Sequence, residues 1–211
     1  MTEPCGCPPL TNRGAHLSDD LQSGVDWLEF TLWGVHVGEV KRVLRGYSPD
    51  DWMELDRGAL GYERQAVGLA NARIFWEPRR KTSPRSGAEV HVTLPGKWCR
   101  SLDEAQMRGL LAYVRAHGRP SRVDLAVDDY ARRVVPEDVR DAFLRNEAVT
   151  HTKRRLFLDS LGSGTTMTVG SAKSRQMLRV YDKAAESNGE IEAIRWEIQA
   201  RDEAAVSLLD S

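Results

Sequence analysis

The chain has 211 residues, of which 41% are hydrophobic and 29% are charged, and its formal net charge is −1. These values are typical of a globular protein with a real core, and no apolar run approaches the roughly eighteen residues that a membrane-spanning helix needs. The first residues lack a basic segment followed by an apolar one, so we expect no signal peptide, no membrane contact and a cytoplasmic protein.

Residues 1–22 are rich in Pro, Gly, Ser and Asp and have no hydrophobic period, which predicts a disordered N-terminal lead. Cys5 and Cys7 in this lead have no second cysteine pair to complete a zinc site, so we expect reduced thiols. Residues 23–211 are predicted to form a single domain. Its last helix stops at Ser211 after about two turns, as in a truncated chain.

Runs of aromatic and β-branched residues predict strands, and apolar residues at helical spacing predict helices. In chain order, the predicted strands are residues 25–33, 73–76, 88–94, 122–128, 155–159, 166–170, 177–182 and 194–201, with 78–87 as a hairpin loop. The predicted helices are residues 37–44, 49–55, 102–117, 136–146 and a last one from Asp202. Ser101 is the expected N-cap of the longest helix, with Glu104 as its capping-box partner.

This order of elements predicts an α+β fold, with a large antiparallel sheet, helices packed on one face, and two similar halves. Alternate residues of a strand share a face, so several strands offer a polar row opposite an apolar row. If helices cover the apolar rows, the polar rows form one open surface. That surface would carry Asp124, Tyr181 and Glu197, and also His91 beside Glu89.

Carboxylate and imidazole groups on one surface suit a divalent cation such as Mg²⁺ or Mn²⁺. Asp124, Glu197 and His91 are therefore candidate metal ligands. The alternative for the whole surface is an ordinary half-solvated sheet, in which polar side chains point outward as a rule. For His91 the alternative is a hydrogen-bonded sheet histidine without a metal.

Residues 168–186 concentrate cations around one tyrosine, Tyr181. Lys173, Arg175, Arg179 and Lys183 lie within this stretch. Such a group suits a phosphodiester that is held for attack by the phenolic oxygen. The alternative is a surface hairpin with solvated charges.

The cations continue upstream, because residues 151–183 contain seven Lys or Arg against two acids. A local basic patch of this kind attracts a phosphate backbone even when the net charge of the protein is near zero. Lys153, Arg154 and Arg155 are therefore candidates for further backbone contacts that carry little sequence information.

Motifs spread along the chain match one family in the order of that family. They are residues 24–28 (GVDWL), 61–62 (GY), 90–96 (VHVTLPG), 99–100 (CR), 122–129 (RVDLAVDD), 169–174 (VGSAKS), 178–183 (LRVYDK) with Glu186, and 195–201 (RWEIQAR). The chain thus resembles the replication initiation factors of rolling-circle plasmids and filamentous phages, a family that includes relaxases of some integrative conjugative elements.

The resemblance implies an enzyme that binds origin DNA, in single-stranded or cruciform, supercoiled form, and nicks and rejoins one strand. It implies a covalent 5′-phosphotyrosine, a free 3′ hydroxyl, dependence on Mg²⁺ or Mn²⁺, and a fold related to the sheet-based relaxases. A host helicase and a second copy of the chain are further partners to expect. The chain lacks a His-x-His pair, because the corresponding strand reads Glu89-Val-His91, so the identity of the metal ligands stays open.

Tyr181 matches the R-x-Y-D-K segment of the family and is the expected nucleophile. Because a free phenol has a pKa near ~10, Lys183 or the metal would have to activate it. The same resemblance assigns phosphate contacts to Lys173, Arg175, Arg179 and Arg201.

A structural role for Tyr181 is an alternative, and Tyr62, Tyr113 and Tyr130 are the alternative nucleophiles. Tyr113 lies near the apolar stripe of the longest helix and is expected to pack, so Tyr130 is the stronger rival. Two other functions stay open: a DNA-binding protein of the same fold without catalysis, and a metal-dependent nuclease that uses water as its nucleophile.

Overall fold

A computed structural model describes residues 20–48, 51–80, 88–160 and 164–210. The predicted disordered lead lies outside the described residues, except for its last few residues, which already belong to the first strand. Most of the predicted hairpin loop, residues 81–87, also lies outside them.

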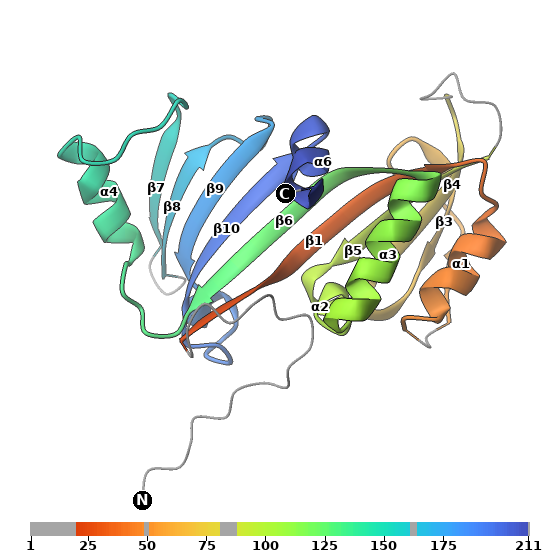
Figure 1. The fold of residues 1–211 in the computed structure, drawn as a ribbon, viewed down its shortest axis with the longest axis horizontal. Coiled ribbons are helices and arrows are strands. Elements are labelled where there is room, and N and C mark those ends of the chain that lie inside the picture. The colour runs from red at the N-terminus through yellow and green to blue at the C-terminus, as the bar shows by residue number, and fades with distance from the viewer. Residues whose placement is uncertain (1–19, 49–50, 81–87, 161–163, 211) are drawn as a thin grey trace, which may run out of the picture.

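Ten strands form one antiparallel sheet (Figure 1), in the order β2-β3-β4-β5-β1-β6-β10-β9-β8-β7. The strands are β1 (Leu21–Trp33), β2 (Met53–Leu55), β3 (Tyr62–Val67), β4 (Arg73–Pro78), β5 (Glu89–Pro95), β6 (Gly118–Asp129), β7 (Arg155–Ser160), β8 (Gly164–Gly170), β9 (Gln176–Asp182) and β10 (Ile194–Arg201). The predicted α+β fold with a large antiparallel sheet is therefore confirmed.

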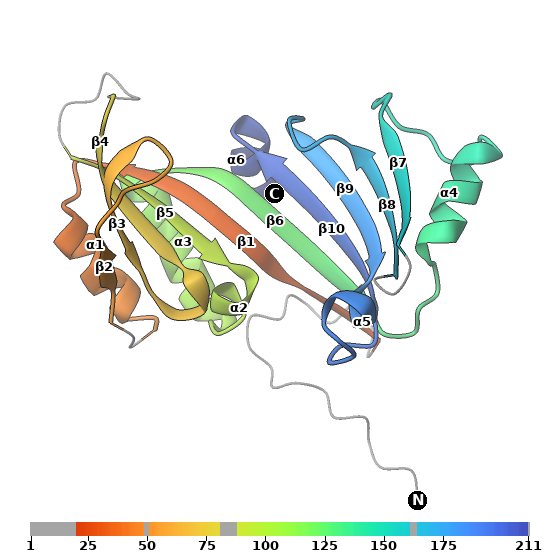
Figure 2. The same cartoon turned by 180° about the vertical axis from the view of Figure 1, so that it is seen from behind.

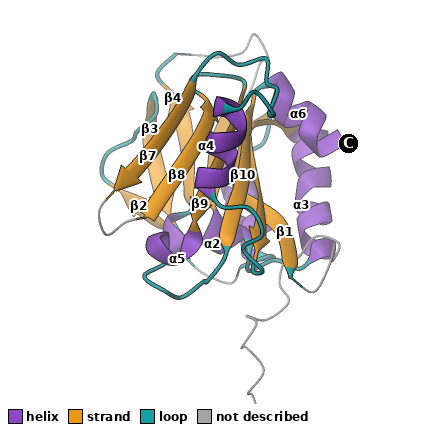
Figure 3. Cartoon of the chain, turned by 90° about the vertical axis from the view of Figure 1, so that its left-hand side faces the viewer, coloured by secondary structure: helices purple, strands orange, loops and turns teal. Residues whose placement is uncertain are grey.

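The longer helices lie on one side of this sheet, as Figures 1 and 3 show. The helices are α1 (Val37–Arg45), α2 (Gly96–Cys99), α3 (Glu104–His117), α4 (Pro136–Leu144), α5 (Lys183–Glu186) and α6 (Glu203–Asp210), with a short 3₁₀ turn at Leu69–Asn71. Among the described residues, none of these helices has both the length and the apolar character to cross a membrane.

The two halves of the chain repeat one arrangement, as expected. Apart from the short helices α2 and α5 and the 3₁₀ turn, each half has a long strand, a helix, four further strands and a final helix, as β1-α1-β2-β3-β4-β5-α3 and again as β6-α4-β7-β8-β9-β10-α6. From the central pair β1 and β6 outward, the sheet reads β5-β4-β3-β2 on one side and β10-β9-β8-β7 on the other. The two halves therefore present equivalent faces of the sheet.

The apolar rows of the strands face the helices. The larger core cluster packs the central and N-terminal strands against α1, α2, α3 and α6, with Leu28, Phe30 and Leu110 fully buried. A smaller cluster lies under α4 and includes Val139, Val180 and Ile194. Because successive side chains of a strand alternate, the polar rows lie on the opposite face of the sheet. Figure 2 turns this face toward the viewer.

Two local predictions were wrong. Residues 49–55 were expected to be helical, but Met53–Leu55 forms the edge strand β2. The N-cap of α3 is Asp103 rather than Ser101, because the Oδ1 of Asp103 accepts a hydrogen bond from the Gln106 N–H at 2.8 Å. The Gln106 side chain completes the capping box by accepting from the Asp103 N–H at 2.9 Å.

The packing of α3 on the sheet can be tested by truncating a buried side chain. Leu110 is fully buried, so Leu110→Ala should lower the free energy of unfolding by about 2–5 kcal/mol. Leu144 of α4 is 74% exposed, and Leu144→Ala should change it by less than about 0.5 kcal/mol. Urea unfolding measures both variants, and similar losses for the two would contradict this packing.

Candidate active site

Three neighbouring strands, β6, β10 and β9, bring polar side chains together on the face opposite the longer helices. In the register of the strands, Arg195 of β10 lies opposite Asp128 of β6 and opposite Tyr181 of β9. Two residues further along β10, Glu197 pairs with Arg179 of β9. The predicted sharing of faces in these strands therefore brings Tyr181 and Glu197 side by side.

The hydroxyl of Tyr181 donates a hydrogen bond to the Oε2 of Glu197 at 3.1 Å. Arg179 and Lys183 flank the ring, with the Arg179 Cζ 5.5 Å and the Lys183 Nζ 5.7 Å from its centroid. Tyr181 is only 7% exposed, yet it lies among charged side chains and outside both apolar core clusters. Two of the four expected cations, Arg179 and Lys183, thus adjoin the phenol.

The surroundings of Tyr181 favour the neutral phenol. Burial raises its pKa well above the ordinary value, the negative charge of Glu197 raises it further, and Arg195 lowers it. Lys183, the expected activator, directs its Nζ to the Oε2 of Glu186 at 2.5 Å. The phenolic oxygen contacts Glu197 at 3.1 Å, and the Tyr181 side chain also hydrogen-bonds to Glu186, so carboxylates lie where a general base would act.

Arg195 lies at the centre of a buried charge network. Its Nε and Nη2 donate to the two carboxylate oxygens of Asp128 at 2.6 and 2.7 Å, and its Nη1 donates to Asp26 at 2.8 Å. Asp26 also pairs with Arg100. Burial acts to lower the pKa of Arg195, but the bonds to Asp128 and the charges of Asp128 and Asp26 outweigh it and hold the pKa above its usual range.

Asp124, a predicted metal ligand, is held by other side chains. Arg122 donates to both of its carboxylate oxygens, at 2.9 and 2.5 Å, and Gln199 lies 3.4 Å from one of them. The guanidinium of Arg122 also stacks on Trp27, 5.0 Å from the ring centroid. Asp124 is therefore a buried carboxylate with a bidentate arginine partner.

The predicted metal-ligand set does not assemble in this structure. His91 lies on β5, two strands from β6, and its Nδ1 is 3.0 Å from the Oγ1 of Thr31, while burial lowers its pKa. Glu197 is engaged by Arg179 and Tyr181. Within the described ranges no three His, Cys, Asp or Glu side chains group closely enough to hold a metal ion. Asp124, Glu197 and His91 thus do not fit one shared ion.

The other predicted DNA-binding cations lie away from the phenol. Lys173 and Arg175 precede β9, and Arg175 is about 20 Å along the strand from Tyr181 at the usual rise per residue. They therefore do not surround Tyr181, contrary to the expectation from their closeness in sequence. Arg155 stacks on Phe143 of α4, with its Cζ 5.0 Å from the ring centroid, on the helix side of the sheet.

The rival tyrosines have different partners. Tyr62 donates to Glu89 at 2.7 Å in the N-terminal half, and five strands separate β3 from β9. The hydroxyl of Tyr130 is 3.2 Å from the Oε1 of Gln22 at the start of β1. The ring of Tyr113 packs on His117 within α3, which agrees with its expected packing role. Tyr181 has two cations beside its ring, Arg179 and Lys183.

Arg195, Asp128, Asp26 and Arg100 were not among the predicted site residues. All four occur in the motifs that carried the family resemblance, at residues 24–28, 99–100, 122–129 and 195–201. The charged residue inside each of these motifs could therefore have been taken as a candidate site residue. The register between the strands could not be derived from the sequence, so the motifs did not indicate that these charges meet.

The chain is similar to known replication initiators. A family model described as "Replication initiation factor" matches residues 118–211. The rolling circle replication initiator protein from Geobacillus stearothermophilus is 20% identical, with a TM-score of 0.72 over 90% of this chain and 78% of that chain. The expected resemblance is thereby confirmed for residues 118–211, and the expected fold for most of the chain.

One further solved structure aligns with the chain, but only weakly. Heterotetrameric sarcosine oxidase from Corynebacterium sp. U-96 aligns with 90% of this chain and 81% of that chain at 13% identity. Its TM-score of 0.23 is too low to indicate a shared fold. No curated protein sequence matches the chain.

The charge network makes a stability prediction. Arg195→Met should lower the free energy of unfolding by about 3–5 kcal/mol, because Asp128 and Asp26 would lose their buried partner. Arg45→Met, which breaks an exposed ion pair with Asp51, should cost less than about 1 kcal/mol. Chemical denaturation compares the two, and equal effects would show that the network does not stabilise the fold.

Proposed function

We propose that this chain, whose residues 118–211 match the replication initiation factor model, nicks and rejoins one strand of origin DNA through a covalent phosphotyrosine. The observation that carries the proposal is the hydrogen bond from the Tyr181 hydroxyl to Glu197, with Arg179 and Lys183 beside the ring. A phenol, a carboxylate and two cations are the groups that a phosphoryl transfer to tyrosine requires.

In the proposed step, the oxygen of Tyr181 attacks the phosphorus while Glu197 takes the phenolic proton. The bond from phosphorus to the 3′ oxygen breaks, and the proton ends on that oxygen, which leaves as a free 3′ hydroxyl. The 5′ phosphate stays on Tyr181. Because the phosphotyrosine is itself a phosphodiester, the reverse attack by a 3′ hydroxyl rejoins the strand without ATP.

Arg179 is suited to hold the phosphate under attack. Its Nη2 is used by Glu197, while its Nε is buried without a hydrogen-bond partner among the described residues. Its side chain is 39% exposed, so an incoming phosphate oxygen can reach the guanidinium. A planar guanidinium binds a phosphate through two parallel hydrogen bonds, which would orient it toward Tyr181.

The proposal includes a requirement for Mg²⁺ or Mn²⁺, which rests on the family resemblance. Such an ion would supply charge stabilisation to the phosphate oxygens when bound. Because Asp124, Glu197 and His91 do not gather around one point, no step is assigned to the ion. Origin DNA is the proposed partner, and a helicase and a second copy of the chain stay predictions.

A trapping assay tests the proposed nucleophile. The protein is incubated with Mn²⁺ and single strands of randomised sequence carrying a 3′ label, and denaturing gels reveal any labelled protein. Strands with a 5′ label should give no labelled protein, because the leaving fragment carries that end. Tyr181→Phe should abolish the adduct, whereas the matched Tyr130→Phe should retain it. Cleavage without an adduct would point to water as nucleophile, and binding alone to a non-catalytic protein.

The same assay tests the proposed base and the metal. Glu197→Gln should lower the rate of adduct formation by about 10²- to 10⁴-fold, because the amide cannot accept the phenolic proton. Strand binding by this variant, measured by fluorescence anisotropy, should stay unchanged. Chelation with EDTA should stop the wild-type reaction and added Mn²⁺ should restore it. An unaffected Glu197→Gln rate would remove this residue from the mechanism.

A further inference from the structure

A row of cations lines the end of the sheet that is remote from Tyr181. We call it the basic rim, and it consists of Lys153, Arg154, Lys173, Arg175 and Arg201. These residues come from the start of β7, the turn between β8 and β9, and the end of β10. In Figure 2 this is the end of these strands beside α6, whereas α5 (Lys183–Glu186) lies at the other end.

Backbone hydrogen bonds hold the segments of the rim together. The Gly170 N–H donates to the carbonyl of Arg154 at 2.9 Å, which ties the approach to β7 to the end of β8. The Arg201 N–H donates to the carbonyl of Arg175 at 2.8 Å, which ties the end of β10 to the turn before β9. The cations are thus fixed on neighbouring strand ends although they are distant in sequence.

Most of the charge of the rim is available to a ligand. Lys153, Arg154, Lys173 and Arg175 are exposed, and none of the four forms an ion pair within the part of the chain that the structure describes, although Arg175 lies near enough to Glu203 to lower the pKa of that carboxyl. The guanidinium of Arg201 bonds only to the neutral Oε1 of Gln199 in that part. At the Tyr181 end of the sheet, by contrast, Arg132 is neutralised by Asp182 at 2.7 Å.

The dimensions of the rim match a nucleic-acid backbone. It crosses four strand ends, β7 to β10, which span about 14 Å at the usual spacing between strands. It lies about 20 Å from Tyr181, which about six nucleotides of a stacked strand cover at an axial rise of about 3.4 Å each, and which fewer nucleotides of an extended strand cover. A strand bound at Tyr181 can therefore reach the rim over the same sheet.

We propose that the basic rim binds the phosphodiester backbone of the strand that reaches Tyr181, at most about six nucleotides from the phosphate that is cut. The inference rests on the proposed function, and it adds a second fixed point on the same strand. Because Lys and Arg contacts to phosphates carry no sequence information, the rim acts as an anchor and leaves base recognition to other residues.

The salt dependence of binding tests the anchor. Each phosphate contact to a single strand contributes about 0.7 to the slope of log K against log salt. With labelled oligo(dT) of thirty nucleotides as the probe, Lys173→Ala/Arg175→Ala should reduce the steepness of that slope by about 1.4. The control Arg42→Ala/Arg108→Ala removes two exposed cations from helices α1 and α3 and should leave it unchanged. Equal slopes in both double variants would overturn the proposal.

A length series tests the spacing. Wild-type affinity for oligo(dT) should rise in a step once the strand is long enough to join the two sites, at no more than about eight nucleotides. The step should vanish in Lys173→Ala/Arg175→Ala and persist in Tyr181→Phe. If Lys173→Ala/Arg175→Ala lowered the affinity for duplex DNA but not for oligo(dT), the assignment of the rim to the single strand would be overturned.

Both experiments measure binding only, so their outcome is independent of catalysis. A normal step without any covalent adduct would contradict the proposed function and leave the anchor intact. An adduct on Tyr181 without a step or a change of slope would contradict the anchor alone. Circular dichroism and the unfolding midpoint of each variant exclude a loss of fold as the cause.

Discussion

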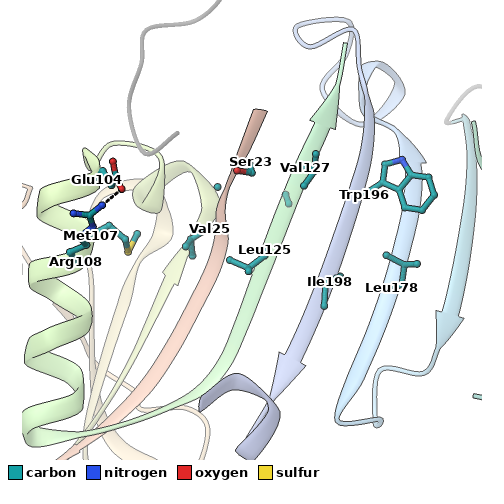
Figure 4. A pocket seen from close by; sticks show the side chains of 12 residues that line it. Ser23, Val25, Glu104, Met107, Arg108, Leu125, Val127, Leu178, Trp196 and Ile198 are labelled. Carbon is teal, nitrogen blue, oxygen red and sulfur yellow. Dashed lines mark hydrogen bonds and ion pairs between the residues drawn. The ribbon is translucent and has the colours of Figure 1, made fainter. Parts of the chain in front are cut away.

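The position of β10 between β6 and β9 is the constraint on which the site depends. Its side chains alternate, so Trp196 and Ile198 point to the helix side while Arg195 and Glu197 point to the open face. Figure 4 shows the apolar row from the helix side, where Trp196 and Ile198 lie beside Leu125 and Leu178. A slip of one residue would exchange the two rows, burying charges among apolar groups and removing Glu197 from Tyr181.

Buried charges on the open face are tolerated because they satisfy one another. Arg195 bonds to Asp128 and Asp26, and Arg122 bonds to Asp124, so few charged groups there lack a partner. Such a network fixes geometry more than it adds stability, since desolvation opposes most of the attraction. Burial and the charge of Glu197 raise the pKa of Tyr181 although Arg195 lowers it, so in the proposed step a base has to remove the phenolic proton, and Glu197 is that proposed base.

Hydrophobic patterns predicted most strands and the main helices, because alternation and helical spacing are local properties of the chain. The strand β3 was missed, since its residues YERQAV show neither pattern clearly. The alternation of side chains predicted which residues of β9 and β10 face the open side, and because these two strands are neighbours in the sheet, Tyr181 and Glu197 come together. The distance of Lys173 and Arg175 from Tyr181 was not foreseen, because closeness in sequence along an extended strand is not closeness in space. His91 was expected beside Asp124 and Glu197 but lies two strands from β6, because the order of strands in a sheet cannot be derived from any single segment of the sequence.

The central claim is that the oxygen of Tyr181 becomes bonded to DNA, and peptide mapping of the trapped complex by mass spectrometry tests it most directly. After nuclease and trypsin digestion, the account predicts that the tryptic peptide 180–183 (VYDK) carries a nucleotide 5′ phosphate on Tyr181. A nucleotide on a peptide containing Tyr130 or Tyr62 instead, or a cut strand whose 5′ phosphate is free of protein, would contradict it.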